Sequence, residues 1–471
     1  MSSRAFRDID DVPLNFNHLK VWFTSGMGFF TDAYDLFIIG IVLIILEGSY
    51  STSFHVTGGN ALVGAGLLGS SAIIAAIFGQ LIWGTIADKF GRKKIYGLEA
   101  GLLAAGAILS AFAWNYWSLF IFRFILGFGI GGDYPVSATI MSEYSNTKDR
   151  GKLIALVFAN QGIGSVAAVA VGLGAVAVLP AEIAWRFMLA FGAIPALAVI
   201  YMRRKLPETP RYAAIVKKDS QGAMKAAGFI KSNAKIDTGV NTNVSSVFTF
   251  FKNYWKTLIV TAGSWFLLDI AFYGTGIFSG PITGSIIPAT DLSSKIVLAG
   301  IPFMVGFFGY FSAVALMDKA GRRTLQVIGF AAMGILYFLV SSFIIAKGTK
   351  ITGFVLPVVV MFALYSLTFF FIDMGPNTTT FVVPAEVYPV KFRTTGHGIS
   401  AAAGKTGAAI TTFFFVYLLA SIGLKEVLMM LAIVSFVGAV ISIFLKETKN
   451  VPLEEAAGEN ISVEKTDNVL A

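Results

Sequence analysis

The chain lacks cysteine altogether, and it is poor in charge and in histidine. Without cysteine it has no disulfide, no thiol nucleophile and no thiolate metal ligand, although this says little about its compartment. The three histidines, His18, His55 and His397, are scattered along the sequence, which also shows no metal-ligand spacing and no Walker-type phosphate loop. These absences argue against an enzyme, a metal site and a bound cofactor.

Charged residues make up 13% of the 471 residues, whereas soluble domains carry about 25%. Hydrophobic residues make up 56%, and the mean hydropathy is +0.74. Apolar runs of about 20 residues, long enough to cross the ~30 Å core of a bilayer, recur roughly twelve times. We therefore predict an all-α polytopic membrane protein with spans near 20–46, 61–87, 95–113, 116–142, 152–179, 185–202, 255–282, 295–317, 324–346, 353–384, 396–420 and 424–445.

The basic residues predict how the chain is oriented in the membrane. The net charge is +9, and 29 of the 36 Lys and Arg residues lie at the N-terminus, in the even-numbered loops or in the tail. Excess positive charge marks the cytoplasmic side, so we predict that both termini face the cytosol. This placement favours the lipid bilayer as a partner over nucleic acid. No cleavable signal stands within residues 1–19. The seven Lys and Arg residues outside the N-terminus, the even-numbered loops and the tail are Lys295, Lys347, Lys350 and Lys425 in odd-numbered loops and Arg123, Arg186 and Lys405 within spans.

A polar, basic stretch in the middle of the chain interrupts the apolar runs. Within it, the segment from Met224 to Ala234 could form an amphipathic helix at the inner leaflet. We expect the stretch to be a solvated linker without chemistry of its own. The predicted units are an N-terminal six-helix bundle over 1–202, a cytoplasmic linker loop over 203–254, a C-terminal six-helix bundle over 255–445 and a cytoplasmic tail over 446–471.

The two halves repeat charged motifs at matched depths. An Asp followed four residues later by Arg comes after spans 2 and 8, and a Glu followed seven residues later by Arg comes after spans 4 and 10. Duplicated bundles of this kind are found in transporters that rock about a midplane site. We interpret the charges as gates that latch in the outward-open state and part in the inward-open one. The gating residues are Asp88, Arg92, Arg150, Asp318, Arg322, Glu386 and Arg393, and Glu143 completes the motif pairs Glu143/Arg150 and Glu386/Arg393.

The stretch from Gly131 to Glu143 is the most unusual, because it places Asp133, Tyr134 and a proline inside a membrane span. Upstream, Arg123 is the lone charge of an apolar run. A charge at the bilayer centre costs about 2.5–3.5 kcal/mol on insertion scales, so both charges need partners. They form either an ion pair that holds helices together or part of a polar pathway through the membrane.

These motifs resemble the major facilitator superfamily. The runs Pro207-Glu-Thr-Pro-Arg211 and Lys446-Glu-Thr-Lys449 look like the ends of spans 6 and 12 in its sugar-porter-like branch. The Gly131–Glu143 stretch looks like the signature of the phosphate:proton symporters, the branch with fungal high-affinity and plant phosphate transporters. The resemblance covers about residues 15–450. It implies a major facilitator fold and proton-coupled import of inorganic phosphate across the plasma membrane, by a chain that functions as a monomer.

The resemblance also implies residue roles. Positions that match the family's phosphate site are Tyr134, Gln161, Trp265, Asp269, Tyr273, Asn377 and Lys405. Positions that match its proton pathway are Asp32, Asp35 and Asp133, with Arg123 and Glu143 nearby.

The residue types fit a phosphate site. Trp265, Asp269 and Tyr273 are spaced i, i+4, i+8, so they form a stripe on one helix face. Lys405 stands among small residues that leave room for an oxyanion, although a salt bridge to Asp269 or Asp373 would also satisfy it. Monovalent phosphate carries O–H groups that the Asp269 carboxylate can accept, whereas sulfate at neutral pH carries none. A second possibility is that Asp269 binds phosphate only when its carboxyl is protonated, which would couple phosphate to a proton. We expect both the selection against sulfate and this coupling to operate.

Asp32 and Asp35 are three residues apart and share a face of span 1. Close carboxylates disfavour double ionisation, which makes this pair with Asp133 a plausible proton relay. Helix capping at a cavity mouth is the alternative.

Other function classes stay open from the sequence. They are a channel, a substrate-sensing receptor, a sugar, organic-anion or organophosphate porter, and coupling to sodium rather than protons. Duplicated halves and buried ionisable residues favour alternating access, and Lys405 near Asp269 argues against a neutral sugar.

Overall fold

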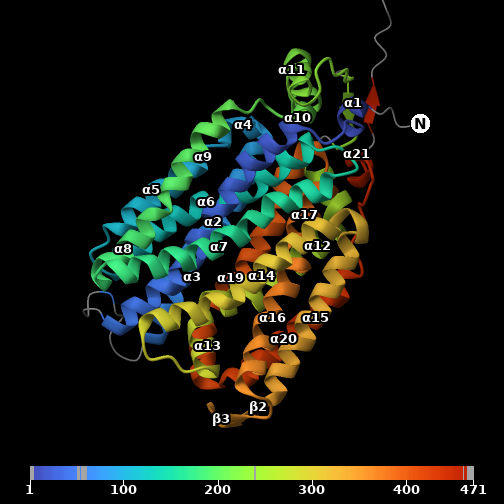
Figure 1. Cartoon of the computed structure of the whole chain (residues 1–471). Helices are drawn as coiled ribbons and strands as arrows, with labels where there is room; N and C mark the ends of the chain where they lie inside the picture. The colour runs from blue at the N-terminus through green and yellow to red at the C-terminus, as the bar shows by residue number, and fades with distance from the viewer. Residues whose placement is uncertain are drawn as a thin grey trace, which may run out of the picture.

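The computed structural model describes residues 5–49, 54, 61–237, 240–244, 246–459 and 461–463. In this part of the chain, twelve helical segments are long and apolar enough to cross a membrane, which confirms the predicted class and number of spans. The spans pack side by side into one elongated bundle (Figure 1). His55 and the end of the predicted tail, 464–471, lie outside the described residues.

The first half contributes six spans. Its helices are α2 (Phe16–Ser49), α3 (Ala61–Phe90), the short α4 (Arg92–Ile95), α5 (Leu98–Ala111), α6 (Tyr116–Tyr144), α7 (Arg150–Val178), and the pair α8 (Ala181–Phe191) and α9 (Ala193–Lys205). The sixth span is therefore broken, and its two helices meet at Gly192. At the start of α6, the Asn115 side chain accepts a hydrogen bond from the Ser118 amide, and the Ser118 hydroxyl accepts one from the Asn115 amide. This reciprocal cap fixes where the helix begins.

The second half also contributes six spans, and its tenth span is not continuous. The helices are α12 (Val247–Ile277), α13 (Ser279–Ile286), α14 (Leu292–Ala320), α15 (Arg322–Phe343), α16 (Val358–Met374), α17 (Pro376–Val382), α18 (Pro384–Val387), α19 (Arg393–Ser421) and α20 (Leu424–Ser442), with a 3-10 turn η1 (Val390–Phe392) before α19. The predicted span near 353–384 is thus three helices. Each break precedes a proline, which lacks the N–H that would continue the helix.

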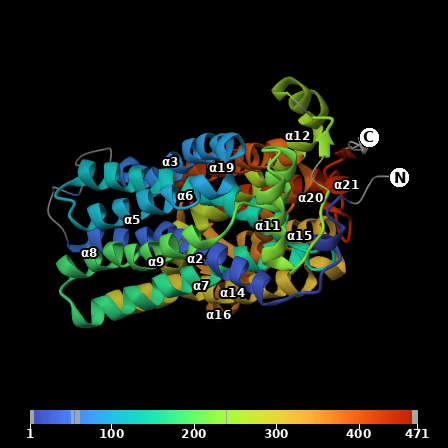
Figure 2. The same cartoon turned by 90° about the horizontal axis from the view of Figure 1, so that it is seen from above.

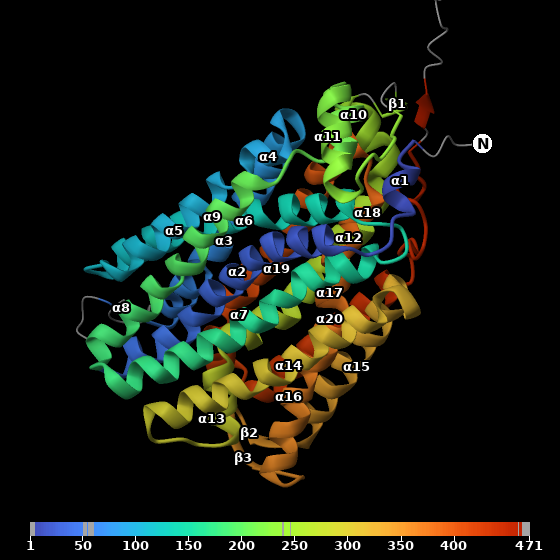
Figure 3. The ribbon, with the colours of Figure 1, turned by 45° about the horizontal axis from the view of Figure 1, so that its top comes forward.

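The chain ends and the central linker gather at one end of the bundle, which we call the terminal face (Figures 1 and 3). Here lie α1 (Arg7–Asp10), α10 (Pro210–Ile215), α11 (Ser220–Ile230) and α21 (Leu453–Ala456), and β1 (Val240–Thr242) pairs antiparallel with β4 (Ile461–Val463). Seen from above, α11 and α21 lie on the side of the bundle away from α8 (Figure 2). The opposite end, the hairpin face, carries the hairpin of β2 (Ile344–Lys347) and β3 (Lys350–Phe354).

The helix predicted over Met224 to Ala234 exists as α11, but it begins and ends four residues earlier. Its buried alanines, Ala223 and Ala227, pack in one apolar cluster with Phe6 and Ile9 of the N-terminal segment. The linker is therefore a folded cap joined to the chain's N-terminus rather than a loose loop.

Two helix pairs join the halves, α3 with α19 and α7 with α14. In the first pair the backbones touch directly. A Cβ built on Gly66 would lie 2.1 Å from the carbonyl oxygen of Phe413, and one built on Gly398 would lie 2.4 Å from that of Gln80. Gly66 lies toward the hairpin face and Gly398 toward the terminal face, so the halves are in contact on both sides of the bundle centre.

Candidate substrate-binding site and gates

The residues predicted to bind substrate come from both halves and meet at the centre of the bundle. Each is at most 3% exposed. They are Tyr134 on α6, Gln161 on α7, Trp265, Asp269 and Tyr273 on α12, Asn377 on α17 and Lys405 on α19. The contacts described below connect all seven into one group.

Lys405 supplies the positive charge of this group. Its Nζ donates to the Tyr273 hydroxyl at 2.7 Å and to Asp269 Oδ2 at 3.1 Å. The ammonium also lies 4.2 Å from the centre of the Tyr273 ring and 4.7 Å from that of the Tyr134 ring. The structure thus contains the salt bridge to Asp269, and Asp373 bonds elsewhere. An ammonium has three N–H donors, and the Tyr134 side chain interacts with it as well, so a ligand would share Lys405 with these residues.

A chain of hydrogen bonds links the two halves across the site. Gln161 Nε2 donates to the Tyr134 hydroxyl at 2.7 Å, and the Tyr310 hydroxyl donates to Gln161 Oε1 at 3.3 Å. Asn377 Nδ2 donates to the Tyr310 hydroxyl at 2.7 Å and to Asp373 Oδ1 at 2.7 Å. Tyr310 is not predicted from the sequence, because it sits in a Phe- and Gly-rich run without a motif. Asp373 is predicted only as a possible partner for Lys405.

The Trp265 indole forms a wall of the site because α19 offers it room. A Cβ built on Gly404 would lie 2.4 Å from Trp265 Cδ1, so a larger residue there would displace the indole. The Trp265 ring lies 6.2 Å from the Tyr134 ring and 5.6 Å from the ring of His397. Lys405 therefore follows directly after a glycine that the packing of Trp265 requires.

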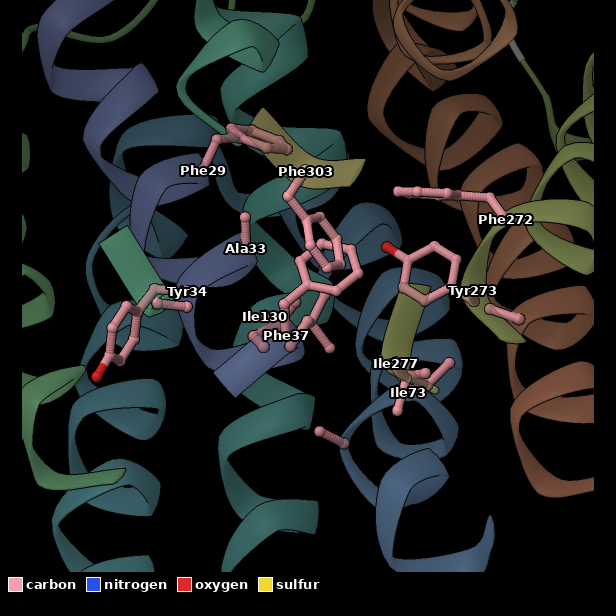
Figure 4. Packing of buried hydrophobic residues seen from close by; sticks show 14 of the residues in the cluster. Phe29, Ala33, Tyr34, Phe37, Ile73, Ile130, Phe272, Tyr273, Ile277 and Phe303 are labelled. Carbon is pink, nitrogen blue, oxygen red and sulfur yellow. The ribbon is translucent and has the colours of Figure 1, made fainter. Parts of the chain in front are cut away.

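An aromatic layer closes the site toward the hairpin face, and Figure 4 shows its rings Phe37, Phe272, Tyr273 and Phe303. The Phe37 ring lies 4.8 Å from Phe303, 5.8 Å from Phe272 and 5.9 Å from Tyr273. These rings come from α2, α12 and α14, so both halves build the layer.

A second aromatic layer closes the site toward the terminal face. The Phe158 and Phe381 rings stack at 4.5 Å, and Phe29 lies 4.8 Å from Phe381 and 5.0 Å from Tyr134. These rings come from α2, α7 and α17, again from both halves. The polar residues of the site thus lie between two layers of packed rings.

The first half contains a separate buried acidic centre. Arg203 donates to both oxygens of Asp133, at 2.6 and 2.7 Å, and to Glu99 Oε1 at 2.9 Å. The guanidinium lies 4.1 Å from the centre of the Tyr96 ring, and Ser137 also donates to Asp133. The sequence analysis placed Arg203 in the linker, whereas the structure buries it in the last turn of α9. Glu99 was not predicted as a site residue from the sequence.

Arg123 and Asp133 do not pair with each other. Arg123 Nη2 donates to the backbone carbonyl of Asp35 at 2.6 Å. The carboxylates of Asp32 and Asp35 are fully buried, and none of their oxygens has a hydrogen-bond partner among the described residues. Asp32 interacts electrostatically with Asp133 and Arg203, so it belongs to the acidic centre. The Asp35 carboxylate lies instead against Gly192, at the break between α8 and α9.

All the residues predicted as gates lie in two ion networks at the terminal face. Glu143 accepts from Arg92 at 3.2 Å, from Arg393 at 3.1 Å and from Thr209 at 2.5 Å. Glu143 had been assigned to the proton pathway, but it lies with the gates and not beside Asp133. Since Arg393 belongs to the second half, this network joins the halves.

The second network is built in the same way around Glu386. It accepts from Arg150 at 2.9 Å, from Arg322 at 2.8 and 3.0 Å and from Thr448 at 2.5 Å. The motif pairs are therefore exchanged between halves: Glu143 binds Arg393, and Arg150 binds Glu386, instead of each Glu binding the Arg that follows it.

The two motif aspartates add further contacts between the halves. Asp88 pairs with Arg92 at 3.1 Å and accepts from the Thr395 amide at 2.6 Å. Asp318 pairs with Arg322 at 2.8 Å and accepts from the Lys152 amide at 2.7 Å. Each aspartate thus binds the arginine of its own half and the backbone of the other, which holds the terminal face shut.

Arg211 ties the cap to these networks. It donates to Asp10 at 2.5 Å, to Glu454 at 2.7 Å and to the Glu143 carbonyl at 2.8 Å. Burial raises the pKa of the Asp10 carboxyl in spite of this contact. For Glu454 burial acts in the same direction, but the charge of Arg211 prevails and lowers the pKa. One guanidinium therefore joins the N-terminal segment, the linker and the tail.

Comparisons with known proteins identify the family of the chain. The family model described as "Sugar (and other) transporter" matches residues 21–459. The chain is 37% identical to the "Probable inorganic phosphate transporter 1-6" of Arabidopsis thaliana, over 96% of this chain and 95% of the relative. It is 36% identical to the "Low affinity inorganic phosphate transporter 1" of Petunia hybrida, over 96% and 95%.

Solved structures share the fold. The proton:xylose symporter XylE bound to 6-bromo-6-deoxy-D-glucose superimposes with a TM-score of 0.80 at 18% identity, covering 94% of this chain and 98% of that one. A partially occluded inward-open XylE from E. coli gives 0.73 at 17% identity, covering 92% and 99%. The chain is therefore a membrane transporter and not an enzyme, and it belongs to the sugar (and other) transporter family of the major facilitator superfamily, in the branch that contains the plant inorganic phosphate transporters.

Proposed function

We propose that the protein imports inorganic phosphate together with protons by alternating access. The observation that carries the proposal is Lys405, a buried cation set between two tyrosine rings within a group of neutral donors from both halves. Phosphate oxygens accept hydrogen bonds from the N–H groups of ammonium and amide and from the O–H groups of hydroxyls. The relatives named as inorganic phosphate transporters support the same substrate.

The pair of Lys405 and Asp269 explains how the site could choose phosphate. Asp269 Oδ1 has no hydrogen-bond partner among the described residues, so it is free to accept an O–H of monovalent phosphate while Oδ2 holds Lys405. Sulfate at neutral pH has no O–H and would meet an unpaired charge. A neutral sugar would leave Lys405 without an anion to bind, which disfavours a sugar as substrate.

The acidic centre supplies the proton site of this proposal. A proton on Asp133 weakens its ion pair with Arg203, which then keeps its ion pair with Glu99. Tyr134 follows Asp133 on α6 and lies against Lys405, so a shift of α6 on protonation is felt in the substrate site. Asp32 lies at this centre and can exchange the proton.

Alternating access then requires the two closures to open in turn. Opening the terminal face breaks the Glu143–Arg393 and Arg150–Glu386 contacts, whereas opening the hairpin face parts the rings around Phe37. In this proposal the terminal face is cytoplasmic, in agreement with its basic residues, and the chain works in the plasma membrane. All seven substrate residues come from one chain, so a monomer suffices.

The test is uptake of labelled phosphate into proteoliposomes, with and without an inward proton gradient, challenged by sulfate, a sugar and a phosphate ester. Accumulation driven by the gradient and blocked by unlabelled phosphate alone is the expected result. Uptake that ignores phosphate, or that follows a sodium gradient, would overturn the proposed substrate or the proposed coupling ion.

A further inference from the structure

A groove of about 400 Å³ opens on the second half close to the terminal face. It is lined by residues 255–261 of α12, by α18 and by the residues that follow α20. Its rim consists of Trp255, Ile259 and Phe444, which are 52, 60 and 72% exposed. All three belong to spans or their immediate ends, so this apolar rim is turned to the bilayer rather than to a neighbouring helix.

Two lysines stand at the groove. Lys256 is exposed, and its Nζ lies 5.6 Å from the centre of the Trp255 ring. Lys446 is also exposed, and its Nζ donates to the carbonyl oxygens of Glu455 at 3.1 Å and Ala456 at 2.7 Å, which hold it in place and leave one N–H donor. In the described part of the chain neither lysine has a carboxylate partner.

The order of these residues along the membrane normal matches the layers of a phospholipid. Trp and Lys are the residues that settle at the headgroup level, and the apolar Ile259 continues α12 toward the acyl region. Two lysines without carboxylate partners attract an anionic headgroup in preference to a zwitterionic one. We propose that this groove is a binding site for an anionic glycerophospholipid, with the headgroup phosphate at Lys256 and Lys446 and the acyl chains along Ile259 and Phe444.

The groove lies directly behind one of the two gate networks. Its buried floor includes Val383 and Val387, which flank Glu386, and Leu445, which leads into Thr448. The Thr448 hydroxyl donates to Glu386 at 2.5 Å, so the groove walls are the backs of two segments that meet at this carboxylate. A bound lipid bridges these segments and stabilises the network that includes Arg150 of the first half. The lipid therefore favours closure of the terminal face.

Lipid binding is tested first, by native mass spectrometry of the full chain with phosphatidylglycerol as the probe and phosphatidylcholine as the reference. Lys256→Gln should lower retention of the first phosphatidylglycerol by about fivefold, the effect of one lysine near an anionic surface. Val260→Trp, which fills the groove, should lower it similarly. The matched control is Lys20→Gln, because Lys20 is also exposed and stacks on an aromatic ring, Phe16, at 5.0 Å in the first half. Equal retention in Lys256→Gln and Lys20→Gln would overturn the site.

The effect on the gate is tested separately, by a spin-label distance across the terminal face. The chain has no cysteine, so Lys94→Cys and Thr324→Cys, exposed positions near the starts of α4 and α15, give one labelled pair. Adding phosphatidylglycerol to phosphatidylcholine nanodiscs should enrich the shorter distances, and Lys256→Gln should remove this response. A distribution that ignores phosphatidylglycerol while the lipid still binds would overturn the coupling. Neither experiment uses phosphate, so neither depends on the proposed substrate.

Discussion

Lys405 and Arg203 are buried cations at the centres of the two halves, and they differ in the number of carboxylates that pair with them. Lys405 in the second half has one carboxylate partner, Asp269, at 3.1 Å. Arg203 in the first half has two, Asp133 at 2.6 Å and Glu99 at 2.9 Å. Positive charge is therefore matched one to one at Lys405 and is outnumbered at Arg203.

For the proposed function, this difference would let a duplicated bundle bind an anion in one half and a proton in the other. A lysine that is paired with a single carboxylate can also donate to a bound anion. An arginine that is paired with two carboxylates leaves one negative charge in excess, which favours protonation of a carboxylate. The terminal faces of the two halves have stayed alike, as the networks around Glu143 and Glu386 show. The halves have therefore diverged at their centres while their gates stayed equivalent.

Removing the cation of the second half should have the largest effect. In Lys405→Gln we expect the affinity for labelled phosphate to fall by about 30-fold or more, because truncating one partner of a buried charge pair costs about 2–5 kcal/mol. The measurement is equilibrium binding in detergent. Lys295→Gln, which changes an exposed lysine at the start of α14, should bind as the wild type does. Full binding by Lys405→Gln would remove the anion role from this half.

Neutralising the first half should separate coupling from transport. In Asp133→Asn we expect proton-driven accumulation to collapse to the level seen without a gradient, while counterflow of phosphate continues, because Arg203 keeps Glu99 and the substrate site keeps Lys405. Paired uptake and counterflow assays measure this. Asp291→Asn, at the exposed cap of α14, is the control. Intact accumulation in Asp133→Asn would mean that the proton binds elsewhere.

Changing the carboxylate of the second half should alter selectivity more than affinity. Asp269→Asn should still bind phosphate, but sulfate should compete about tenfold or more better, since a like-charge contact costs several kcal/mol. Loss of the pH dependence of uptake would be the companion effect if the protonated carboxyl binds phosphate. If competition by sulfate and coupling both stay at wild-type values, Asp269 serves only to hold Lys405.

The smallest effect is expected from the hydroxyl that links the halves. Tyr310→Phe keeps the ring and removes the hydrogen bonds to Gln161 and Asn377, so KM for phosphate should rise about fivefold, as a net loss of about 1 kcal/mol implies. Tyr337→Phe is the matched control, because it removes a buried hydroxyl that bonds the Ala271 carbonyl outside the site. Similar KM values in both variants would make Tyr310 a packing residue.

Much of the fold and of the candidate site could be predicted from the sequence, because a polar residue is conspicuous inside an apolar run. The twelve spans follow from the length of those runs, and Asp133, Asp269 and Lys405 stand out as charges within them. The repeated motifs located the gate residues, which the structure gathers at one face. A motif that occurs in both halves does not show whether its Glu pairs with the Arg of the same half or of the other half. The pairing of Arg150 and Arg393 with the Glu of the opposite half was therefore not predicted.

Residues in ambiguous surroundings were missed for physical reasons. Arg203 begins a run of three basic residues, so it looked like a loop cation, and only the packing of α9 against α2 and α5 shows that it is buried. Tyr310 lies among phenylalanines, where its hydroxyl carries no pattern. The breaks at Gly192 and Gly375 do not change the hydropathy of their spans, so continuous helices were expected there.

The two aromatic layers around the site have an electrical consequence. Packed rings offer a hydrated ion no replacement for the hydrogen bonds of its water shell. An ion that crossed both layers would therefore have to lose its hydration shell at each of them. With rings from both halves in each layer, a wire of water through the bundle centre would require both layers to part together. A bilayer containing many copies of the protein should thus show no steady conductance under voltage, and charge should cross only in discrete turnovers.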